Sequence, residues 1–417
     1  MKFLVIGSGG REHAIAWKIA QSESCDKVFV APGNGGTALE NKCENFKYNS
    51  FDDLIDLCKR EKIDLTVVGP EAPLVDGVVD AFTNEGLSII GPHKEAAVLE
   101  GSKIFAKDFM KKHGIKTAKY ESFDDYNKAV EFIDTMEYPI VIKADGLAAG
   151  KGVVIAGDKD EAIETLKEFM LNERFNEAGK SVVVEEFLEG VEASIVTLFD
   201  GEKIIPFISC KDHKRAHEGD EGPNTGGMGV VSPNLHVNEE VMNDFINNIM
   251  EPTLTGLKND KLTFKGFIFF GIMIKNGVSY LLEYNVRMGD PETQAIMSLM
   301  ESDFASILKK CMDNSLEVED ISWKDKHCCA VVLASGGYPL KYKKGIDIQY
   351  NDNLQEESKV FFAGAEVEDS KLRTSGGRVA CVTAIGNDSN EAYDKAYESI
   401  ENVQFDGMFF RKDIGKI

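Results

Sequence analysis

Short apolar runs alternate with helical patterns through residues 1–91, and this alternation limits the possible folds more than any other feature. The runs include "KFLVIG", "KVFVAPGN", "IDLTVVGP" and "LSIIGP", with amphipathic stretches such as "FDDLIDLCKREK" between them. Strands that alternate with helices at this spacing form a parallel sheet, because parallel neighbours need a crossover connection. We therefore predict a doubly wound parallel α/β domain for residues 1–101, with ligands bound at the loops that follow its strands.

Composition and charge exclude several classes of protein. The chain has 417 residues, more than one hydrophobic core normally serves, so we expect about two to four domains. Its formal net charge of −23 opposes binding to DNA or RNA, and no apolar run is long enough to span a bilayer. The start, "MKFLVIGSGG", lacks the order of a signal peptide, and the cysteines form no C-x-x-C pair. We expect a cytoplasmic protein with reduced core thiols that binds neither nucleic acid nor membrane.

The patterns change after the first domain, where we predict four further segments. Ser102 caps a helix that Gly114 ends. The lysines Lys103, Lys107 and Lys111 share one face of this helix, and such a row is most often a solvated surface. The four segments are a linking helix (102–118), a small α+β unit (119–188), a larger α+β unit (189–325) and a small strand-rich C-terminal domain (326–417).

A glycine-rich loop lies within "KADGLAAGKGVVI", residues 143–155. A Walker A phosphate loop needs four residues between its glycines and a Ser or Thr after its lysine. Here Gly146 and Gly150 enclose three residues, and Gly152 follows Lys151, so the Walker interpretation fails. Backbone N–H groups of such a loop can still hold phosphates, and a glycine-rich hairpin without a ligand is the alternative.

The loop after the first strand, "GSGGRE", is a second candidate phosphate site. It lacks the third glycine of a dinucleotide fingerprint, and "VFVAPGN" ends the second strand without a ribose-binding acid, so NAD is disfavoured. Gly9 and Gly10 at the start of a helix could still hold one phosphate, with Arg11 adding positive charge. A tight turn with a solvated arginine explains these residues equally well.

The most informative stretch is "YLLEYNVRMGDPETQ". Glu283 and Asn285 are two residues apart on a predicted strand, so both side chains project from one face and can reach one ion. One carboxylate and one amide oxygen suit Mg²⁺, which completes its shell with water and phosphate. Arg287 continues this face if the strand persists, and Asp290 and Glu292 follow at a turn. A surface strand with a polar face is the alternative.

Several motifs, taken together and in order, resemble those of one enzyme family. A strand lysine before the glycine loop, the run "VVVEEFLEGVE" and the later E-x-N strand resemble the ATP-grasp superfamily. Within it, the chain resembles the phosphoribosylamine–glycine ligase family, also called glycinamide ribonucleotide synthetases. The matching motifs are "GSGGREHA", "APGNGGTA", "VGPEAPL", "LEGSK", "KADGLAAGKGV", "DHKR", "GPNTGGMG" and "NVRMGDPETQ". The match covers essentially the whole chain and implies an ATP-grasp fold between the first domain and the C-terminal domain.

The resemblance implies an ATP site between the two α+β units. Lys143 and a lysine of the preceding helix, Lys103 with Lys107 as the alternative, would contact the phosphates, and the glycine loop would close over them as a lid. The hinge 185–188 would read the adenine through its main chain, and Glu192 would bind the ribose. The implied ATP-binding residues are Lys103, Lys143, Gly146, Gly150, Lys151, Gly152, Glu185, Glu186, Phe187, Leu188 and Glu192.

The family's reaction joins glycine to 5-phosphoribosylamine with ATP, giving glycinamide ribonucleotide, ADP and phosphate. It implies a glycyl phosphate intermediate, so catalysis needs positioning and charge rather than a side-chain nucleophile. The implied catalytic residues are Arg287, Lys143 and Asp212, and the implied ligands of Mg²⁺ or Mn²⁺ are Glu283 and Asn285. The implied substrate-binding residues are Gly9, Gly10, Arg11, Asn34, Lys214 and Asp290.

One departure from the superfamily pattern leaves the number of metal ions open. The strand before E-x-N, "GFIFFGIMI", has no acid where many ATP-grasp enzymes supply another metal ligand.

His213 and His217 could carry protons but are more often solvated in so polar a loop. The alternatives are another carboxylate–amine ligase and a nucleotide-binding module without catalysis. A transient contact with the upstream amidotransferase is a further prediction.

Overall fold

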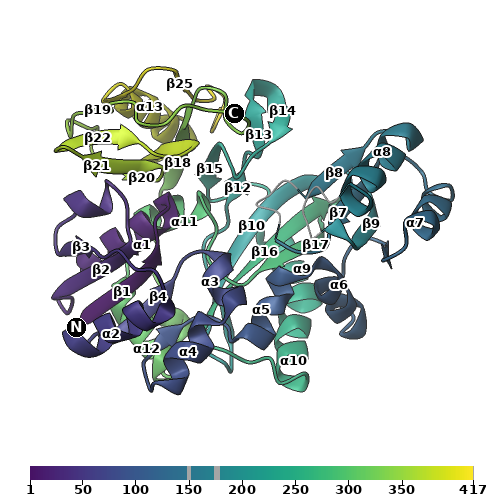
Figure 1. The fold of residues 1–417 in the computed structure, drawn as a ribbon, viewed down its shortest axis with the longest axis horizontal. Coiled ribbons are helices and arrows are strands. Elements are labelled where there is room, and N and C mark those ends of the chain that lie inside the picture. Colours follow the sequence, from purple (N-terminus) through teal and green to yellow (C-terminus); the bar gives the residue numbers. More distant parts are fainter. Residues whose placement is uncertain (148–151, 173–178, 417) are drawn as a thin grey trace.

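The computed structural model describes residues 1–147, 152–172 and 179–416, which form an N-terminal domain, a C-terminal domain and an arm around a central sheet (Figure 1). The N-terminal sheet is parallel, in the order β3-β2-β1-β4-β5, as predicted. Alternate residues of β1 enter two different cores, so helices cover both faces. The strands are β1 (Lys2–Gly7), β2 (Lys27–Pro32), β3 (Cys43–Asn45), β4 (Leu65–Val68) and β5 (Ile89–Ile90). The helices are α1 (Gly10–Ala20), α2 (Phe51–Glu61), α3 (Glu71–Asp76), α4 (Val78–Asn84) and α5 (Lys94–Gly101).

A linking helix, α6 (Lys103–Lys112), leads from this domain to the arm. Its first turn is capped as predicted, because the Ser102 hydroxyl accepts a hydrogen bond from the Phe105 N–H at 3.0 Å. Gly114, with φ of 67°, follows its end. The arm is an antiparallel sheet in the order β6-β9-β7-β8 with two helices packed on it. Its elements are β6 (Tyr120–Phe123), α7 (Tyr126–Ile133), β7 (Ile140–Ala144), β8 (Val153–Ala156), α8 (Lys159–Met170) and β9 (Val182–Glu186).

The central sheet lies between the arm and the other domains and is antiparallel, in the order β11-β10-β16-β17. The strands predicted at "GFIFFGIMI" and around Glu283 and Asn285 are both present in it. The strands of the sheet are β10 (Val191–Phe199), β16 (Gly266–Lys275) and β17 (Val278–Asn285), with the short β11 (Ile204–Pro206) at one edge. The helical segments of this region are α9 (Glu239–Phe245), a π-helical turn (Ile246–Met250), α10 (Glu251–Asn259), α11 (Glu292–Leu299) and α12 (Phe304–Met312).

The C-terminal sheet takes in strands from outside the segment predicted for it. Its order is β12-β15-β18-β23-β20, with β25 (Met408–Phe409) paired to β18. The first two strands, β12 (Lys211–Asp212) and β15 (Gly229–Ser232), precede residue 326, so the predicted boundary there divides a sheet. The remaining strands are β18 (His327–Ser335), β20 (Ser358–Phe362) and β23 (Arg378–Gly386), which α13 (Ser389–Ile400) covers. Three two-stranded antiparallel pairs complete the region: β13 (Arg215–His217) with β14 (Glu221–Asn224), β19 (Gln349–Tyr350) with β24 (Val403–Gln404), and β21 (Ala365–Glu368) with β22 (Lys371–Thr374).

Helix α11 lies where the N-terminal domain, the central sheet and the C-terminal sheet meet. All of its residues are buried, and it packs against α1, β18 and β23. The turn that precedes it, Asp290–Pro291, therefore reaches the junction of all three parts.

All eight cysteines are free thiols, and Cys328 and Cys329 enter cores on opposite faces of the C-terminal sheet. In the part of the chain that the structure describes, no helix is both long and apolar enough to cross a membrane.

Candidate active site

Strand β17 presents both predicted metal ligands on one face. It pairs with β16, and Glu283 and Asn285 lie opposite Gly271 and Phe269 in the register. Positions two apart in a strand share a face, so the sequence spacing predicts this arrangement correctly. Glycine at 271 leaves room for the carboxylate side chain, because a Cβ there would lie 3.2 Å from Glu283 Cγ. The charged oxygen and the amide oxygen therefore face the same side of the sheet.

Arg287 reaches these ligands by a different route from the one predicted. β17 ends at Asn285, so Arg287 does not continue the strand face. Its guanidinium turns back instead, and Nη2 donates to Asn285 Oδ1 at 3.2 Å and pairs with Glu100 Oε1 at 2.8 Å. Glu71 lies 3.6 Å from Nε on the same guanidinium. Carboxylates from α3 and α5 therefore hold this arginine beside the predicted metal ligands.

Lysines keep Glu283 charged. Lys103 Nζ, on the first turn of α6, lies 3.0 Å from Glu283 Oε2. Lys103, assisted by Lys214, holds the pKa of Glu283 well below its ordinary value, although burial opposes ionisation. Burial alone would lower the pKa of Lys103, but Glu283 outweighs burial and raises it. The pair is therefore ionised on both sides at neutral pH.

A buried triad of Lys107, Lys143 and Glu185 joins α6 to the arm. Lys143 Nζ lies 2.9 Å from Glu185 Oε1, and Lys107 Nζ lies 3.0 Å from Glu185 Oε2. Burial lowers the pKa of Lys107 to about 8 in spite of the carboxylate. Burial also opposes ionisation of Glu185, but the two lysines hold its pKa below the ordinary value. The solvated-row interpretation is therefore wrong for Lys103 and Lys107, and only Lys111 of that row is exposed.

The hinge that follows the triad has one main-chain group already engaged. The Glu186 N–H donates to the Lys119 carbonyl at 3.0 Å. Of the two main-chain groups of Glu186, the carbonyl is therefore the one that could contact a nucleotide. Leu188 is buried. The carboxylate of Glu192 pairs with Lys214 Nζ at 2.5 Å, so Lys214, predicted at the substrate, lies beside the residue predicted to bind the ribose.

The glycine loop is described only at its two ends. Gly146 has φ of 126°, a conformation that side chains with a Cβ rarely adopt, and Gly152 is buried beside β8. The predicted phosphate contacts Gly150 and Lys151 lie outside the described residues.

A carboxylate occupies the start of α1. The Gly9 N–H donates to Glu12 Oε2 at 2.5 Å, and Arg11 Nε pairs with Glu12 Oε1 at 2.5 Å. Gly7 is required here, because a Cβ would lie 2.4 Å from Glu12 Cγ. Part of the anion-binding capacity of this helix start is therefore used internally, and the phosphate role of Gly9, Gly10 and Arg11 stays a prediction.

The side-chain amide of Asn34 is bonded to the backbone of the same loop, and its predicted contact with the substrate stays a prediction. Its Nδ2 donates to the carbonyls of Ser8 at 2.9 Å and Phe362 at 2.8 Å, and its Oδ1 accepts from Gly36 N and Thr37 N. The amide has no free donor hydrogen, because both are directed at backbone carbonyls. Asn34 therefore positions the loop after β1.

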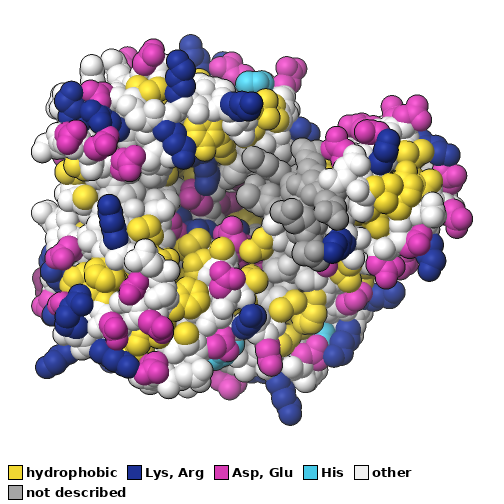
Figure 2. All heavy atoms as spheres, viewed as in Figure 1, with side chains coloured by type: hydrophobic (Ala, Val, Ile, Leu, Met, Phe, Trp, Pro, Cys, Tyr) yellow, Lys and Arg dark blue, Asp and Glu magenta, His cyan; other side chains and the backbone are white. Residues whose placement is uncertain are grey.

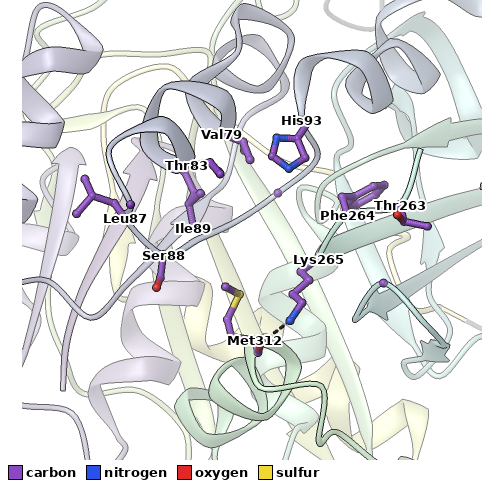
Figure 3. A pocket seen from close by; sticks show the side chains of 13 residues that line it. Val79, Thr83, Leu87, Ser88, Ile89, His93, Thr263, Phe264, Lys265 and Met312 are labelled. Carbon is purple, nitrogen blue, oxygen red and sulfur yellow. Dashed lines mark hydrogen bonds between the residues drawn. The ribbon is translucent and has the colours of Figure 1, made fainter. Parts of the chain in front are cut away.

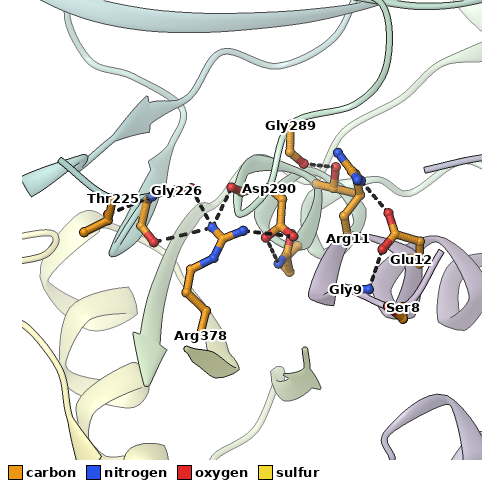
Figure 4. A network of polar contacts seen from close by, with 12 residues as sticks. Ser8, Gly9, Arg11, Glu12, Thr225, Gly226, Gly289, Asp290 and Arg378 are labelled. Atoms are coloured by element: carbon orange, nitrogen blue, oxygen red, sulfur yellow. Dashed lines mark hydrogen bonds and ion pairs between the residues drawn. The ribbon is translucent and has the colours of Figure 1, made fainter. Parts of the chain in front are cut away.

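Asp290 connects to an arginine that the sequence analysis did not single out. Arg378 Nη2, from the start of β23, lies 3.2 Å from Asp290 Oδ2, and Arg378 Nη1 donates to the Asp290 carbonyl at 2.8 Å (Figure 4). Asp290 also accepts from Gln294 Nε2 at 2.9 Å. Burial opposes ionisation of Asp290, but Arg378 and Arg11 outweigh it and lower its pKa. Side chains from all three parts of the molecule therefore meet at this turn.

Burial shifts the pKa values of the neighbouring residues Asp212 and His213 in opposite directions. The Oδ1 atom of Asp212 is buried and has no hydrogen-bond partner among the described residues. Burial and the carboxylate of Glu292 raise the pKa of Asp212 well above its ordinary value. Burial lowers the pKa of His213 to about 4, and its Nδ1 lies 3.2 Å from the Gly229 carbonyl. The Asp212 carboxylate is thus a stronger base than an ordinary carboxylate, whereas His213 is neutral at pH 7.

The donors at β17 can hold a divalent cation only if phosphate and water supply its remaining ligands. Among the described residues, no three His, Cys, Asp or Glu side chains gather in a way that could hold a metal ion. Glu283 and Asn285 supply one charged and one neutral oxygen, the hard donors that Mg²⁺ and Mn²⁺ take alongside phosphate and water.

The surface is hollowed between the N-terminal domain and the C-terminal domain, and acidic and basic side chains lie in this hollow (Figure 2). A separate cavity of about 440 Å³ lies beside β5, between Ile89, His93, Lys265 and Met312 (Figure 3). No candidate site residue lines it.

Sequence reasoning missed three side chains that organise the site: Glu12, Glu100 and Arg378. A signal existed for Glu12, since a small residue three positions before a glutamate is the pattern of a capping box. Glu100 accepts from the Val286 N–H, 186 residues away, and Arg378 donates to Asp290, 88 residues away, and no local pattern indicates such pairings.

Three family models match this chain: phosphoribosylglycinamide synthetase N domain at residues 1–100, its ATP-grasp (A) domain at 101–293 and its C domain at 328–417. A phosphoribosylamine–glycine ligase from Clostridium acetobutylicum is 54% identical over 100% of both chains. One from Fusobacterium nucleatum is 51% identical over 100% of this chain and 99% of its own. The crystal structure of the Thermotoga maritima enzyme superposes with a TM-score of 0.87 at 37% identity, covering 99% of this chain and 100% of that one. The chain therefore belongs to the phosphoribosylamine–glycine ligase family of ATP-grasp enzymes.

Proposed function

We propose that the charged cluster around β17 is where this chain joins glycine to 5-phosphoribosylamine while ATP is cleaved to ADP and phosphate. This ATP-dependent ligation, a step of purine biosynthesis, is the activity of its family and forms a carbon–nitrogen bond. One observation carries the assignment to these side chains: Glu283 and Asn285 share a face of β17, with Lys103 and Arg287 fixed against them. A nucleotide-binding module without chemistry has no use for an arginine fixed in that position.

In the first half of the reaction, the glycine carboxylate attacks the γ-phosphate of ATP and forms glycyl phosphate and ADP. Lys143 and Lys103 supply positive charge to the phosphates, and Arg287 supplies it to the group in transfer. Each of these cations already has a carboxylate partner that holds it in position. The site is therefore organised before substrates bind, and little rearrangement has to accompany the transfer.

Glu283 and Asn285 would hold Mg²⁺ or Mn²⁺ together with the ATP phosphates and water. The ion, when bound, neutralises phosphate charge and orients the nucleotide. Because only one of the two protein ligands is charged, the free protein should bind the ion weakly. Sub-micromolar Mg²⁺ binding without nucleotide, measured by calorimetry, would contradict this ligand set.

In the second half, the ribosylamine nitrogen attacks the carbonyl carbon of glycyl phosphate, phosphate leaves, and the nitrogen gives up a proton. Asp212 is our candidate for the proton acceptor, because its pKa is raised and its Oδ1 has no partner among the described residues. Asp290 and Arg11 would contact the ribosylamine from the N-terminal side. Arg11→Ala should raise the KM for ribosylamine, and an unchanged KM would remove Arg11 from the site.

The assay that tests the function is ADP release by the purified protein with ATP and Mg²⁺. Glycine is added alone and then with phosphoribosylamine generated in the assay, and alanine replaces glycine as the control. We expect release that needs both glycine and ribosylamine. Release with a different acid would make the chain another carboxylate–amine ligase, and nucleotide binding without release would make it a binding module. Transfer of ribosylamine from an upstream amidotransferase stays a prediction.

A further inference from the structure

Arg378 directs its guanidinium almost entirely at main-chain carbonyl groups of other parts of the molecule. It begins β23 of the C-terminal sheet, yet its Nη1 donates to Gly226 O at 2.5 Å and to Asp290 O at 2.8 Å, with Gly227 O at 3.5 Å (Figure 4). Its Nη2 pairs with the Asp290 carboxylate. A planar guanidinium can hold several acceptors at once in a fixed arrangement, which an ammonium cannot. Arg378 therefore ties residues 226–227 to the turn that begins at Asp290.

Tyr338 holds the same segment from its other side. Its hydroxyl accepts a hydrogen bond from the Gly226 N–H at 3.1 Å. Glycine at 226 allows the close approach of Arg378, because a Cβ there would lie 3.2 Å from Arg378 Cζ. Glycine at 377 likewise makes room for the tyrosine ring, since a Cβ there would lie 2.3 Å from Tyr338 Cδ2. Two side chains of the C-terminal domain therefore bind both the donor and the acceptor of one glycine.

The segment held in this way lies between a candidate catalytic residue, Asp212, and the turn that begins at the candidate substrate-binding residue Asp290. Gly227 has φ of 110°, and a Cβ there would lie 2.8 Å from Asp212 Oδ1 and 2.6 Å from Pro291 Cδ. Any shift of Gly227 therefore changes the space between Asp212 and the turn at Asp290. Asp212 lies on β12 at the edge of the C-terminal sheet, and Asp290 lies in the turn before α11, so their spacing depends on contacts that the C-terminal domain supplies.

We propose that Arg378 is a positioning residue for the acceptor half of the reaction: it fixes Gly226 and Gly227 against the Asp290 turn and so shapes the side of the cleft that takes the ribosylamine. This inference rests on the proposed function, because it assigns Asp212 and Asp290 to the acceptor side. It gives the C-terminal domain a part in catalysis although Arg378 touches no reacting atom. The nucleotide side depends on other residues and should not change when Arg378 is replaced.

The experiment measures kcat and the KM of each substrate for Arg378→Ala, Arg378→Lys and Tyr338→Phe, and for Arg378→Ala combined with Tyr338→Phe. Arg373→Ala is the matched control, since Arg373 belongs to the same domain and pairs only with Asp347 and Glu368 among the described residues. Thermal unfolding and the Kd of ADP are measured for every variant. The wild-type requirement for both glycine and ribosylamine is established first, so failure of the proposed function would be visible before any variant is compared.

For Arg378→Ala we expect kcat/KM for ribosylamine to fall about a hundredfold, because misplacement of this segment by about 1 Å can cost that much. The KM of ATP and the Kd of ADP should stay within about twofold of wild type. Tyr338→Phe should have the same effect on a smaller scale, and Arg378→Lys should recover part of the loss. The double variant should be less impaired than the product of the two single effects, because both act through Gly226.

Several outcomes would overturn the inference. If wild-type activity is established and Arg378→Ala leaves kcat/KM for ribosylamine unchanged, Arg378 does not position the acceptor side. Equal losses for ATP and ribosylamine, together with a fall in Tm much larger than that of Arg373→Ala, would reduce Arg378 to a stabilising residue. Strictly multiplicative effects of the two single variants would show that Arg378 and Tyr338 act separately, as they would if Arg378 bound the substrate directly.

Discussion

Replacing the buried Lys107 with methionine is expected to stabilise this protein at neutral pH. Lys107 is 2% exposed, and burial lowers its pKa from 10.5 to about 8 although Glu185 lies 3.0 Å away. A pKa that falls this far on folding means that the charged form costs about 3 kcal/mol of stability at pH 7. The variant also loses the hydrogen bond from Lys107 to Thr117 Oγ1, which contributes about 1 kcal/mol. The net gain expected is about 2 kcal/mol.

The pH dependence of this gain follows from where Lys107 releases its proton. The folded protein loses that proton near pH 8, whereas the unfolded chain keeps it up to about pH 10.5. Wild-type stability therefore rises with pH between these values, because the unfolded state binds more protons there. Below pH 8 the cost of the buried charge is fully present. The advantage of Lys107→Met should consequently be largest at pH 7 and shrink steadily towards pH 10.

Thermal unfolding followed by circular dichroism at pH 7 and pH 9.5 measures both effects. A gain of about 2 kcal/mol corresponds to roughly 4–8 °C in Tm for a cooperative unit of about 200 residues. Lys111→Met is the control, because Lys111 lies on the same helix but is exposed. A lower Tm for Lys107→Met at pH 7, or the same gain at both pH values, would refute the argument that desolvation outweighs the attraction of Glu185.

Three further predictions concern the site. Glu283→Gln should lower kcat about a hundredfold because it removes the charged metal ligand at constant shape, and near-normal ADP release would contradict the metal assignment. Arg287→Lys should also lower kcat about a hundredfold, because one ammonium cannot reach both Glu100 and Asn285. A retained kcat would show that catalysis does not need the guanidinium in this fixed position. His213→Asn should flatten the acid dependence of stability. The folded pKa near 4 lies below the ordinary 6.5, so wild type alone loses up to about 3 kcal/mol as pH falls through that window, and parallel stability curves for the two proteins would contradict this.

Local periodicity predicted the features of the fold that depend on near neighbours. Alternation of strands and helices led to the parallel N-terminal sheet, and the two-residue spacing led to the shared face of Glu283 and Asn285. The helix after Ser102 also followed from its cap. These predictions held because strand pleat and helix capping are properties of short segments.

What could not be predicted depends on contacts between distant segments. Arg287 faces Asn285 because the chain turns back beyond β17, and Glu100, far away in the sequence, holds it there. The buried state of Lys107 depends on Glu185 of the arm, so the face of the helix alone suggested a solvated lysine. Arg378 likewise contacts Gly226 and Asp290, which are distant from it in the sequence. Each of these charges is placed by tertiary packing, which leaves no periodic trace in the sequence.

The C-terminal sheet begins well before the C-terminal family match at residues 328–417. Strand β15 (Gly229–Ser232) pairs along β18 at residues 328–331, so a fragment cut at residue 328 would leave that edge without its neighbour. An uncovered edge of apolar strand offers its N–H and C=O groups to any other chain, which promotes aggregation. A soluble C-terminal fragment, or a fusion that transplants this unit, should therefore have to carry residues 211–232 with it.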